Sequence, residues 1–158
     1  MMVMSVERFI PHIRRKTISG GASEVLDGRY RLVEVIEGST LTANEGKIRT
    51  LRVDGSLAII NVPVKNLYLN RGQARITNDV EYLSERNTSV VNMKGNAGIA
   101  EVIGSILSIV GNIGHLKYAA NAYVTSKGKI GHRSRGKGGG VITKLGGTVS
   151  IKPNPEFL

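Results

Sequence analysis

Residues 97–116 read AGIAEVIGSILSIVGNIGHL, and their apolar side chains recur at intervals of three and four residues. This recurrence is carried by Ile99, Val102, Ile103, Ile106, Ile109, Val110, Ile113 and Leu116. Such spacing places side chains on one face of an α-helix. The opposite face would hold Glu101, Gly104, Ser105, Ser108, Asn112 and His115. We therefore predict one long amphipathic helix over about residues 97–124, which Asn96 can cap.

Three turn signals divide the preceding stretch, residues 24–93, into short runs of alternating apolar and polar residues. They are Asp27-Gly28, Asp54-Gly55 and Asn70-Arg71-Gly72. Asp-Gly between alternating runs is a strong hairpin cue, because both turn positions favour residues that tolerate positive φ. The two Asp-Gly segments are faintly alike, and one such likeness is too little to establish a repeat. These signals predict a small antiparallel β-sheet or barrel over residues 24–93.

Together these elements predict an α+β fold that ends in a further β-hairpin. The C-terminal hairpin would pair residues 141–145 with residues 148–152 across Gly146-Gly147. We divide the chain into a basic N-terminal arm (1–21), a globular body (22–125), and a basic glycine-rich loop with a C-terminal hairpin and tail (126–158). The length of 158 residues suits one domain.

The net charge of +10 comes entirely from the two ends of the chain. Residues 1–21 hold four basic residues and one acidic residue, whereas residues 117–158 hold eight basic residues and one acidic residue. The span between them holds ten of each and is neutral. A neutral body with cationic extensions is suited to binding something acidic outside the fold.

Eight cations are therefore the candidate binding residues for nucleic acid or an acidic partner: Arg14, Arg15, Lys16, Lys127, Lys129, Arg133, Arg135 and Lys137. The last five alternate with Gly and Ser, which indicates a flexible loop that can follow an irregular anionic surface. Three interpretations stay open: contact with an acidic protein face, neutralisation of phosphates, and a solvated loop with no partner. The aromatic content of 4% argues against recognition of single strands by base stacking.

The expected helix suggests a packing surface. Gly104 and Ser108 form a small-x-x-x-small pair, and Asn112 follows one turn later, so we assign these three residues to helix packing or a subunit interface. About 20 residues can also span a bilayer. Glu101 and His115 lie inside the stretch, however, and its two faces differ, which favours packing on the sheet over membrane insertion.

The sequence offers no catalytic, metal or cofactor site. Absence of cysteine excludes disulfides, thiolate nucleophiles and Cys-based metal centres. His12, His115 and His132 lack metal-ligand spacing, and a ribonuclease-like acid–base role for His132 conflicts with its glycine-rich setting. The glycines after residue 135 lack phosphate-loop spacing. Glu81 and Glu85 lie four residues apart, a weak signal of paired carboxylates.

These observations lead us to expect a non-enzymatic structural or assembly protein of a larger particle, such as a phage or viral virion component. Its basic segments would contact neighbouring subunits, in a homo- or hetero-oligomer, or nucleic acid. The alternatives are a sequence-nonspecific DNA- or RNA-binding module and a peripheral membrane protein. The first residues lack the pattern of a secretory signal, so we expect a cytoplasmic origin without secretion.

Overall fold

The computed structural model describes residues 14–145, and every regular element in this range is a β-strand. The strands are β1 (Arg15–Ile18), β2 (Ser23–Val35), β3 (Thr40–Asp54), β4 (Leu57–Ile60), β5 (Val64–Asn70), β6 (Gln73–Ile76), β7 (Val80–Arg86), β8 (Val90–Lys94), β9 (Ala97–Ile103), β10 (Ile106–Val110), β11 (Ile113–Ala119), β12 (Ala122–Ser126), β13 (Ile130–Arg135) and β14 (Gly140–Lys144).

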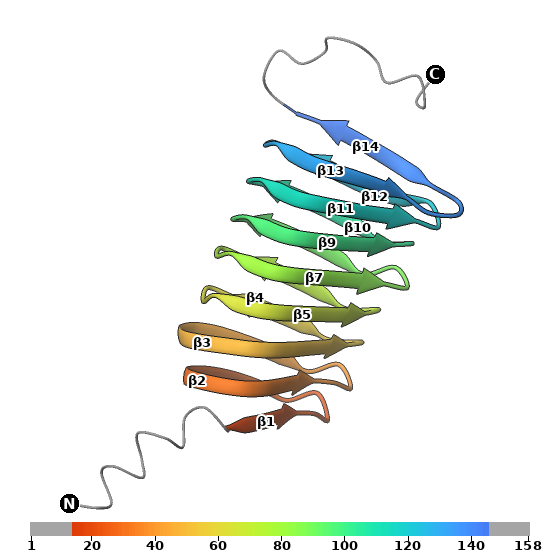
Figure 1. Ribbon diagram of the computed structural model, residues 1–158. Coiled ribbons are helices and arrows are strands. Elements are labelled where there is room, and N and C mark those ends of the chain that lie inside the picture. Colours follow the sequence, from red (N-terminus) through yellow and green to blue (C-terminus); the bar gives the residue numbers. More distant parts are fainter. Residues whose placement is uncertain (1–13, 146–158) are drawn as a thin grey trace, which may run out of the picture.

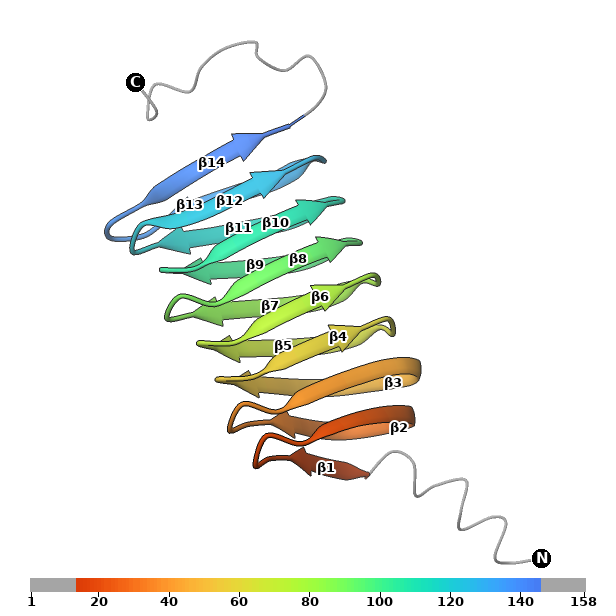
Figure 2. The same ribbon diagram turned by 180° about the vertical axis from the view of Figure 1, so that it is seen from behind.

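All strand pairs among these residues are parallel, and they form two facing layers. The front sheet contains β5, β7, β9, β11 and β13 (Figure 1). The back sheet contains β4, β6, β8, β10, β12 and β14 (Figure 2). β3 joins the two layers, because residues 40–43 pair with β4 and residues 48–54 pair with β5. β2 runs alongside the whole of β3, and β1 pairs with the end of β2.

The chain advances in coils of nearly constant length, and each coil contributes one strand to the back sheet and one to the front sheet. In the back sheet, equivalent residues of successive strands stand next to one another, in the order Leu57, Gln73, Val90, Ile106, Tyr123 and Val141. The fold is therefore a parallel β-solenoid of two strands per coil, with β1 near one end and β13 and β14 at the other (Figure 1).

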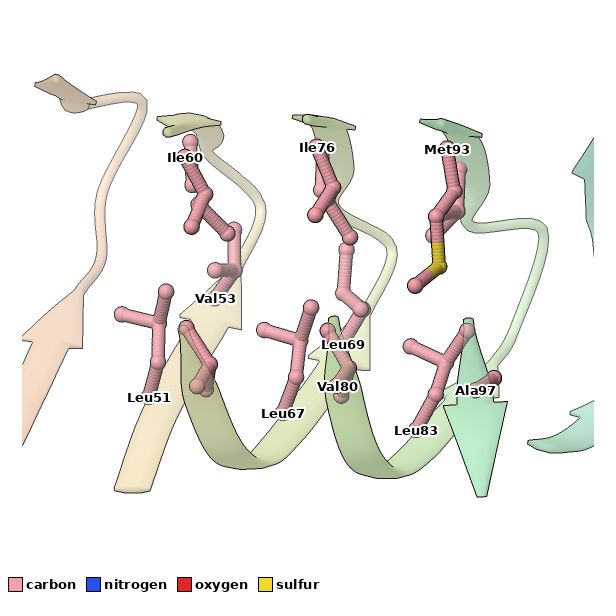
Figure 3. Packing of buried hydrophobic residues seen from close by; sticks show 14 of the residues in the cluster. Leu51, Val53, Ile60, Leu67, Leu69, Ile76, Val80, Leu83, Met93 and Ala97 are labelled. Atoms are coloured by element: carbon pink, nitrogen blue, oxygen red, sulfur yellow. The ribbon is translucent and has the colours of Figure 1, made fainter. Parts of the chain in front are cut away.

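The core lies between the two sheets and consists of stacked rows of identical or similar side chains. Leu51, Leu67 and Leu83 follow one another on the front sheet and face the row formed by Ile60, Ile76 and Met93 (Figure 3). All six side chains are almost completely buried. Each buried aliphatic side chain of this size stabilises the fold by about 1.5–3 kcal/mol through removal from water. Because the rows repeat from coil to coil, the buried core extends along the solenoid as far as β11 and β12.

The corners between the sheets contain residues with positive φ and rows of polar side chains that are hydrogen-bonded from coil to coil. At the corner that leads from the front to the back sheet, a left-handed residue recurs in successive coils, including Gly55 (φ 56°), Arg71 (φ 51°) and Gly104 (φ 57°). Serine residues that follow these corners in the sequence accept hydrogen bonds from backbone N–H groups of the adjacent coil. For example, Ser105 Oγ accepts a hydrogen bond from Ser89 N at 3.1 Å. These bonds satisfy buried donors that the strands leave unpaired.

A second ladder occupies the corner that leads from the back to the front sheet. Asp79 Oδ1 accepts a hydrogen bond from Asn96 N, Asn96 Oδ1 from Asn112 N, and Asn112 Oδ1 from Lys129 N, at 2.8 to 2.9 Å. Each side chain thus bonds to the backbone of the following coil. The ladder fixes the stacking of the coils up to Lys129.

The predicted helix over residues 97–124 is wrong. This segment contains the four strands β9, β10, β11 and most of β12. The expected apolar stripe is split between the two sides of the sheets: Val102, Ile109, Ile113 and Leu116 are buried, whereas Ile106 and Val110 are 46% and 51% exposed. Short strands separated by corners place inward residues at irregular intervals, and these intervals imitated a helical period.

The predicted antiparallel sheet is also wrong, although two of its turn signals mark true corners. Asp54-Gly55 and Asn70-Arg71-Gly72 connect a front strand to the next back strand, so the strands on either side belong to opposite layers. Asp27-Gly28 lies inside β2, next to a register shift between Leu26 and Asp27. The prediction failed because at Asp54-Gly55 and Asn70-Arg71-Gly72 the chain passes from one sheet to the other, instead of folding back within one sheet.

The C-terminal region differs from the expectation in the same way. Residues 140–144 form β14, which pairs in parallel with β12. Residues 148–152, expected as the second half of a hairpin, lie outside the described residues. Residues 130–135, expected within a flexible loop, form β13 of the front sheet. Within residues 14–145 no helix has the length and hydrophobicity of a membrane span.

Candidate functional site

The predicted N-terminal cations lie at one end of the solenoid, and two of them contact this chain. The Lys16 ammonium lies 2.8 Å from Glu24 Oε1. Its hydrogen bond to Glu24 and the negative charge of that carboxylate raise the pKa of Lys16. The Arg14 guanidinium lies 5.2 Å from the centre of the Tyr30 ring. Arg15 is exposed on β1. At this end, therefore, Lys16 forms an ion pair within the chain.

The predicted C-terminal cations lie on the last coils, at the other end. Together with Lys144 they form a group that we name the cationic end, which comprises Lys127, Lys129, Arg133, Arg135, Lys137 and Lys144. All six residues are exposed. Arg133 and Arg135 come from β13, Lys144 ends β14, and the other three flank these strands. The topology thus brings residues of two different sheets onto one end of the molecule.

Three members of the cationic end occupy positions that face inward in the rest of the solenoid. Arg133 pairs with Leu116 and Arg135 with Tyr118 across β11 and β13, and both β11 residues are buried. Lys144 pairs with the buried Ser126 in the same way. In a parallel stack, paired residues point to the same side of the sheet. The last coil therefore presents arginine and lysine where the earlier coils present core residues.

No carboxylate accompanies these cations in the sequence of the last coils. Residues 102–145 contain seven Lys or Arg and no Asp or Glu. The ion pairs found among residues 14–145 are Lys16–Glu24, Arg71–Asp54 and Arg86–Glu101, and none of them involves the cationic end. The positive charge of the last coils is therefore not balanced within the described part of the chain.

The cationic end coincides with an open sheet edge. β13 and β14 terminate the order of hydrogen-bonded strands within residues 14–145. Each has a neighbour on one side, β11 or β12 respectively. A terminal strand presents unpaired N–H and C=O groups on its other side and can accept a further strand. The cationic end thus combines positive charge with backbone hydrogen-bonding groups.

The residues assigned to a helix interface do not share one face. Gly104 occupies the corner between β9 and β10, Ser108 is half-buried on β10, and Asn112 belongs to the polar ladder before β11. Since the helix that was expected to hold them does not form, the packing role that rested on helical spacing is lost. Gly104 instead supplies a left-handed turn, with φ of 57°.

Two histidines stack on the outer face of the front sheet. His115 and His132 are paired across β11 and β13, with ring centres 5.8 Å apart, and His115 Nε2 lies 2.7 Å from Ser134 Oγ. His12 lies outside the described residues. No group of three or more potential metal ligands occurs within residues 14–145.

Glu81 and Glu85 are not a pair, because Glu81 is exposed and Glu85 points into the core. Glu85 lies between Leu69 and Val102, is fully buried, and neither carboxylate oxygen has a hydrogen-bond partner. Burial raises the pKa of Glu85 well above its ordinary value. The protonated form is therefore favoured in the core.

Sequence reasoning missed Lys144 and the inward orientation of Arg133 and Arg135. The signal that could have revealed them is the length of one coil, since Arg133 stands one coil after Leu116 and Lys144 one coil after Ser126. An alignment of the chain with itself at the coil spacing would have placed Arg133 at the end of an otherwise apolar column, which contains Leu51, Leu67, Leu83, Ala100 and Leu116. No protein-family model, curated protein or solved structure matches this chain.

Proposed function

We propose that this protein is a non-enzymatic component of a larger assembly and that its cationic end docks on an acidic surface of a neighbouring protein subunit. The observation that carries the proposal is the set of exposed cations on the last coils, with no carboxylate between residues 102 and 145. Unbalanced charge at one end of an elongated body favours an oriented, end-on contact.

Two features support a protein neighbour over nucleic acid. The cations surround an open strand edge, whose N–H and C=O groups match those of another polypeptide. Their unbalanced charge is also concentrated at one end, whereas a duplex binder gains affinity from phosphate contacts distributed along a groove or face. Nucleic-acid binding is therefore an outcome to be tested against the proposal.

The test compares an acidic polypeptide with nucleic acid as probes for the full-length chain. Poly-L-glutamate, a random-sequence DNA duplex and a single-stranded RNA are titrated at several salt concentrations. One variant carries Arg133→Gln, Arg135→Gln and Lys137→Gln at the cationic end. The matched control carries Arg49→Gln, Lys65→Gln and Arg75→Gln, which removes three exposed cations from the middle of the solenoid.

We expect the variant at the cationic end to lose at least about tenfold in affinity for poly-L-glutamate, which corresponds to about 1.4 kcal/mol. The control should lose less than about threefold. Equal losses in both variants would mean that only overall charge matters and would overturn the proposal. Tighter binding of duplex or single strand than of poly-L-glutamate at the same salt concentration would overturn it in favour of a nucleic-acid partner.

A further inference from the structure

We propose that the open edge of β13 accepts an extended strand of the partner, and that this strand carries acidic residues at every second position. This inference rests on the proposed function and deepens it. Polyglutamate tests only whether the cationic end binds acidic protein. The inference here concerns the geometry of that binding, namely strand addition in a fixed side-chain register.

The backbone geometry of β13 supports strand addition. β13 spans six residues, pairs with β11 on one side and, among residues 14–145, has no neighbour on the other. Every neighbouring pair in the front sheet is already parallel and in register. A partner strand would continue this pattern at the spacing of about 4.8 Å between strands. Its main chain would supply the hydrogen bonds, whatever its side chains.

The side chains of β13 determine which strand fits. Arg133 and Arg135 are two residues apart and project to the same side, the side that faces the core in the preceding coils. His132 and Ser134 project to the outer side. Directly opposed residues on neighbouring strands are close enough for opposite charges to attract each other. A partner with Glu or Asp at alternate positions would therefore place a carboxylate beside each arginine.

A second copy of this chain is a poor occupant of the same edge. At the opposite end of residues 14–145 the last strand is β1, which carries Arg15 and Lys16. End-to-end stacking in the solenoid register would bring Lys16, which holds an inward position next to Val33, against Arg133. Like charges directly opposite one another destabilise a strand pair. The Glu24 carboxylate at that end is already bonded to Lys16 at 2.8 Å and offers no separate partner for Arg133. The charges of the two ends thus favour a different, acidic strand over a second copy of the chain.

The experiment uses the full chain and two peptides of identical composition. In one peptide Glu and Thr alternate over eight residues, and in the other four Glu precede four Thr. We expect the alternating peptide to bind at least about tenfold more tightly. We also expect it to slow hydrogen exchange at the amides of β13 that do not bond to β11. In the double variant Arg133→Glu and Arg135→Glu, an alternating Lys–Thr peptide should replace the Glu–Thr peptide as the preferred ligand.

The double variant Lys127→Gln and Lys129→Gln is the matched control, because it removes two cations from the same end but not from β13. It should keep the preference for the alternating peptide. Equal binding of the two Glu–Thr peptides, or no change in exchange at β13, would overturn strand addition while leaving acidic docking intact. Protection of the outer β13 amides in the free protein would also overturn it, because the edge would then be covered by the chain itself.

Discussion

The two ends of the solenoid solve the same physical problem with different charges. At the first coil, Lys16 and Glu24 occupy inward positions beside the buried Val33 and Leu41, and they pair with each other at 2.8 Å. At the last coil, Arg133 and Arg135 occupy inward positions, and no ion pair with them is found among residues 14–145. Within the described residues, the inward lysine of the first coil is paired with a carboxylate of the chain, and the inward arginines of the last coil are not.

This difference separates protection of an edge from recognition. Inward-pointing charges on a terminal strand prevent uncontrolled pairing with other sheets, and both ends of this solenoid carry them. Protection alone would be served equally well by a neutral pair at each end. The excess of cations at the last coil is therefore the feature on which the proposed acidic partner rests.

The largest expected effect compares two corner glycines, one nearer each end, of which only the one before β11 lacks room for a Cβ beside the adjacent coil. A Cβ added to Gly111, in the corner before β11, would lie 2.0 Å from the carbonyl oxygen of Gly95, whereas Gly38, in the corner after β2, has nothing within 4 Å. Gly111→Ala should lower the free energy of unfolding by about 3 kcal/mol or more, because backbone of the adjacent coil must move. Gly38→Ala should cost about 1–2 kcal/mol, the strain of its positive φ alone.

Urea denaturation followed by circular dichroism measures both glycine variants, with the slope of the transition as a check that the cooperative unit is unchanged. Similar losses in the two proteins would show that backbone contact with the adjacent coil does not determine the cost of a Cβ at the corner before β11.

The next effect tests an inward charge placed in the middle of the solenoid. Glu85 has the same orientation as Lys16 or Arg133 but is fully buried without a hydrogen-bond partner. Glu85→Leu would continue the apolar column of Leu69 and Val102. It should raise the free energy of unfolding at neutral pH by about 2 kcal/mol, because an unsatisfied buried carboxyl group is costly. Glu81→Leu, on the exposed side of the same strand, should change it by less than about 0.5 kcal/mol.

The stability gained by Glu85→Leu should depend on pH. The folded state holds the proton of Glu85 to a higher pH than the unfolded chain, in which the pKa is near the ordinary value of 4.5. The folded state then binds more protons, so the parent loses stability as the pH rises from about 4.5 through the raised pKa. The gain from Glu85→Leu should accordingly be larger at pH 8 than at pH 4. A gain that does not depend on pH would contradict the assignment of a protonated carboxyl group.

The sequence of a single strand shows that it is a strand, but not which strands pair with it or in which direction. Alternation of apolar and polar residues correctly indicated strands in residues 24–93. Alternation is, however, typical of antiparallel sheets with one wet face, whereas parallel sheets are usually covered on both sides. The solenoid combines parallel pairing with a wet outer face, and no single strand shows this. Only the coil spacing does, as in Asp54, Asn70 and Asn87, which occupy equivalent places in successive coils and whose side chains are hydrogen-bonded in sequence.

The helix error has a more local cause. Residues 97–116 are rich in Ile and Val, whose branched Cβ atoms favour strands, and they contain several glycines. Both features argued against a helix, but the apolar spacing outweighed them. The excess of cations toward the ends of the chain could be read from composition, because charge needs no knowledge of pairing, but Arg133 and Arg135 lie in β13 and not in the expected loop. Their inward orientation could not be predicted, since it depends on the register of β13 against β11.

The smallest expected effect compares the two ends directly. Lys16→Met removes the partner of Glu24, whereas Arg133→Met removes an exposed cation that has no carboxylate partner among the described residues. Lys16→Met should therefore lower the melting temperature slightly and Arg133→Met should not.

The pKa of Lys16 is raised in the folded state. The contribution of the Lys16–Glu24 ion pair to stability is therefore complete below the ordinary lysine pKa of 10.5 and is lost as the pH rises through the raised value. The difference between the two variants should shrink above pH 10.5 and in high salt, because both conditions weaken the ion pair. If Arg133→Met lowers the melting temperature as much as Lys16→Met at neutral pH, the arginine already has an anionic partner within the full chain, and the asymmetry between the ends disappears.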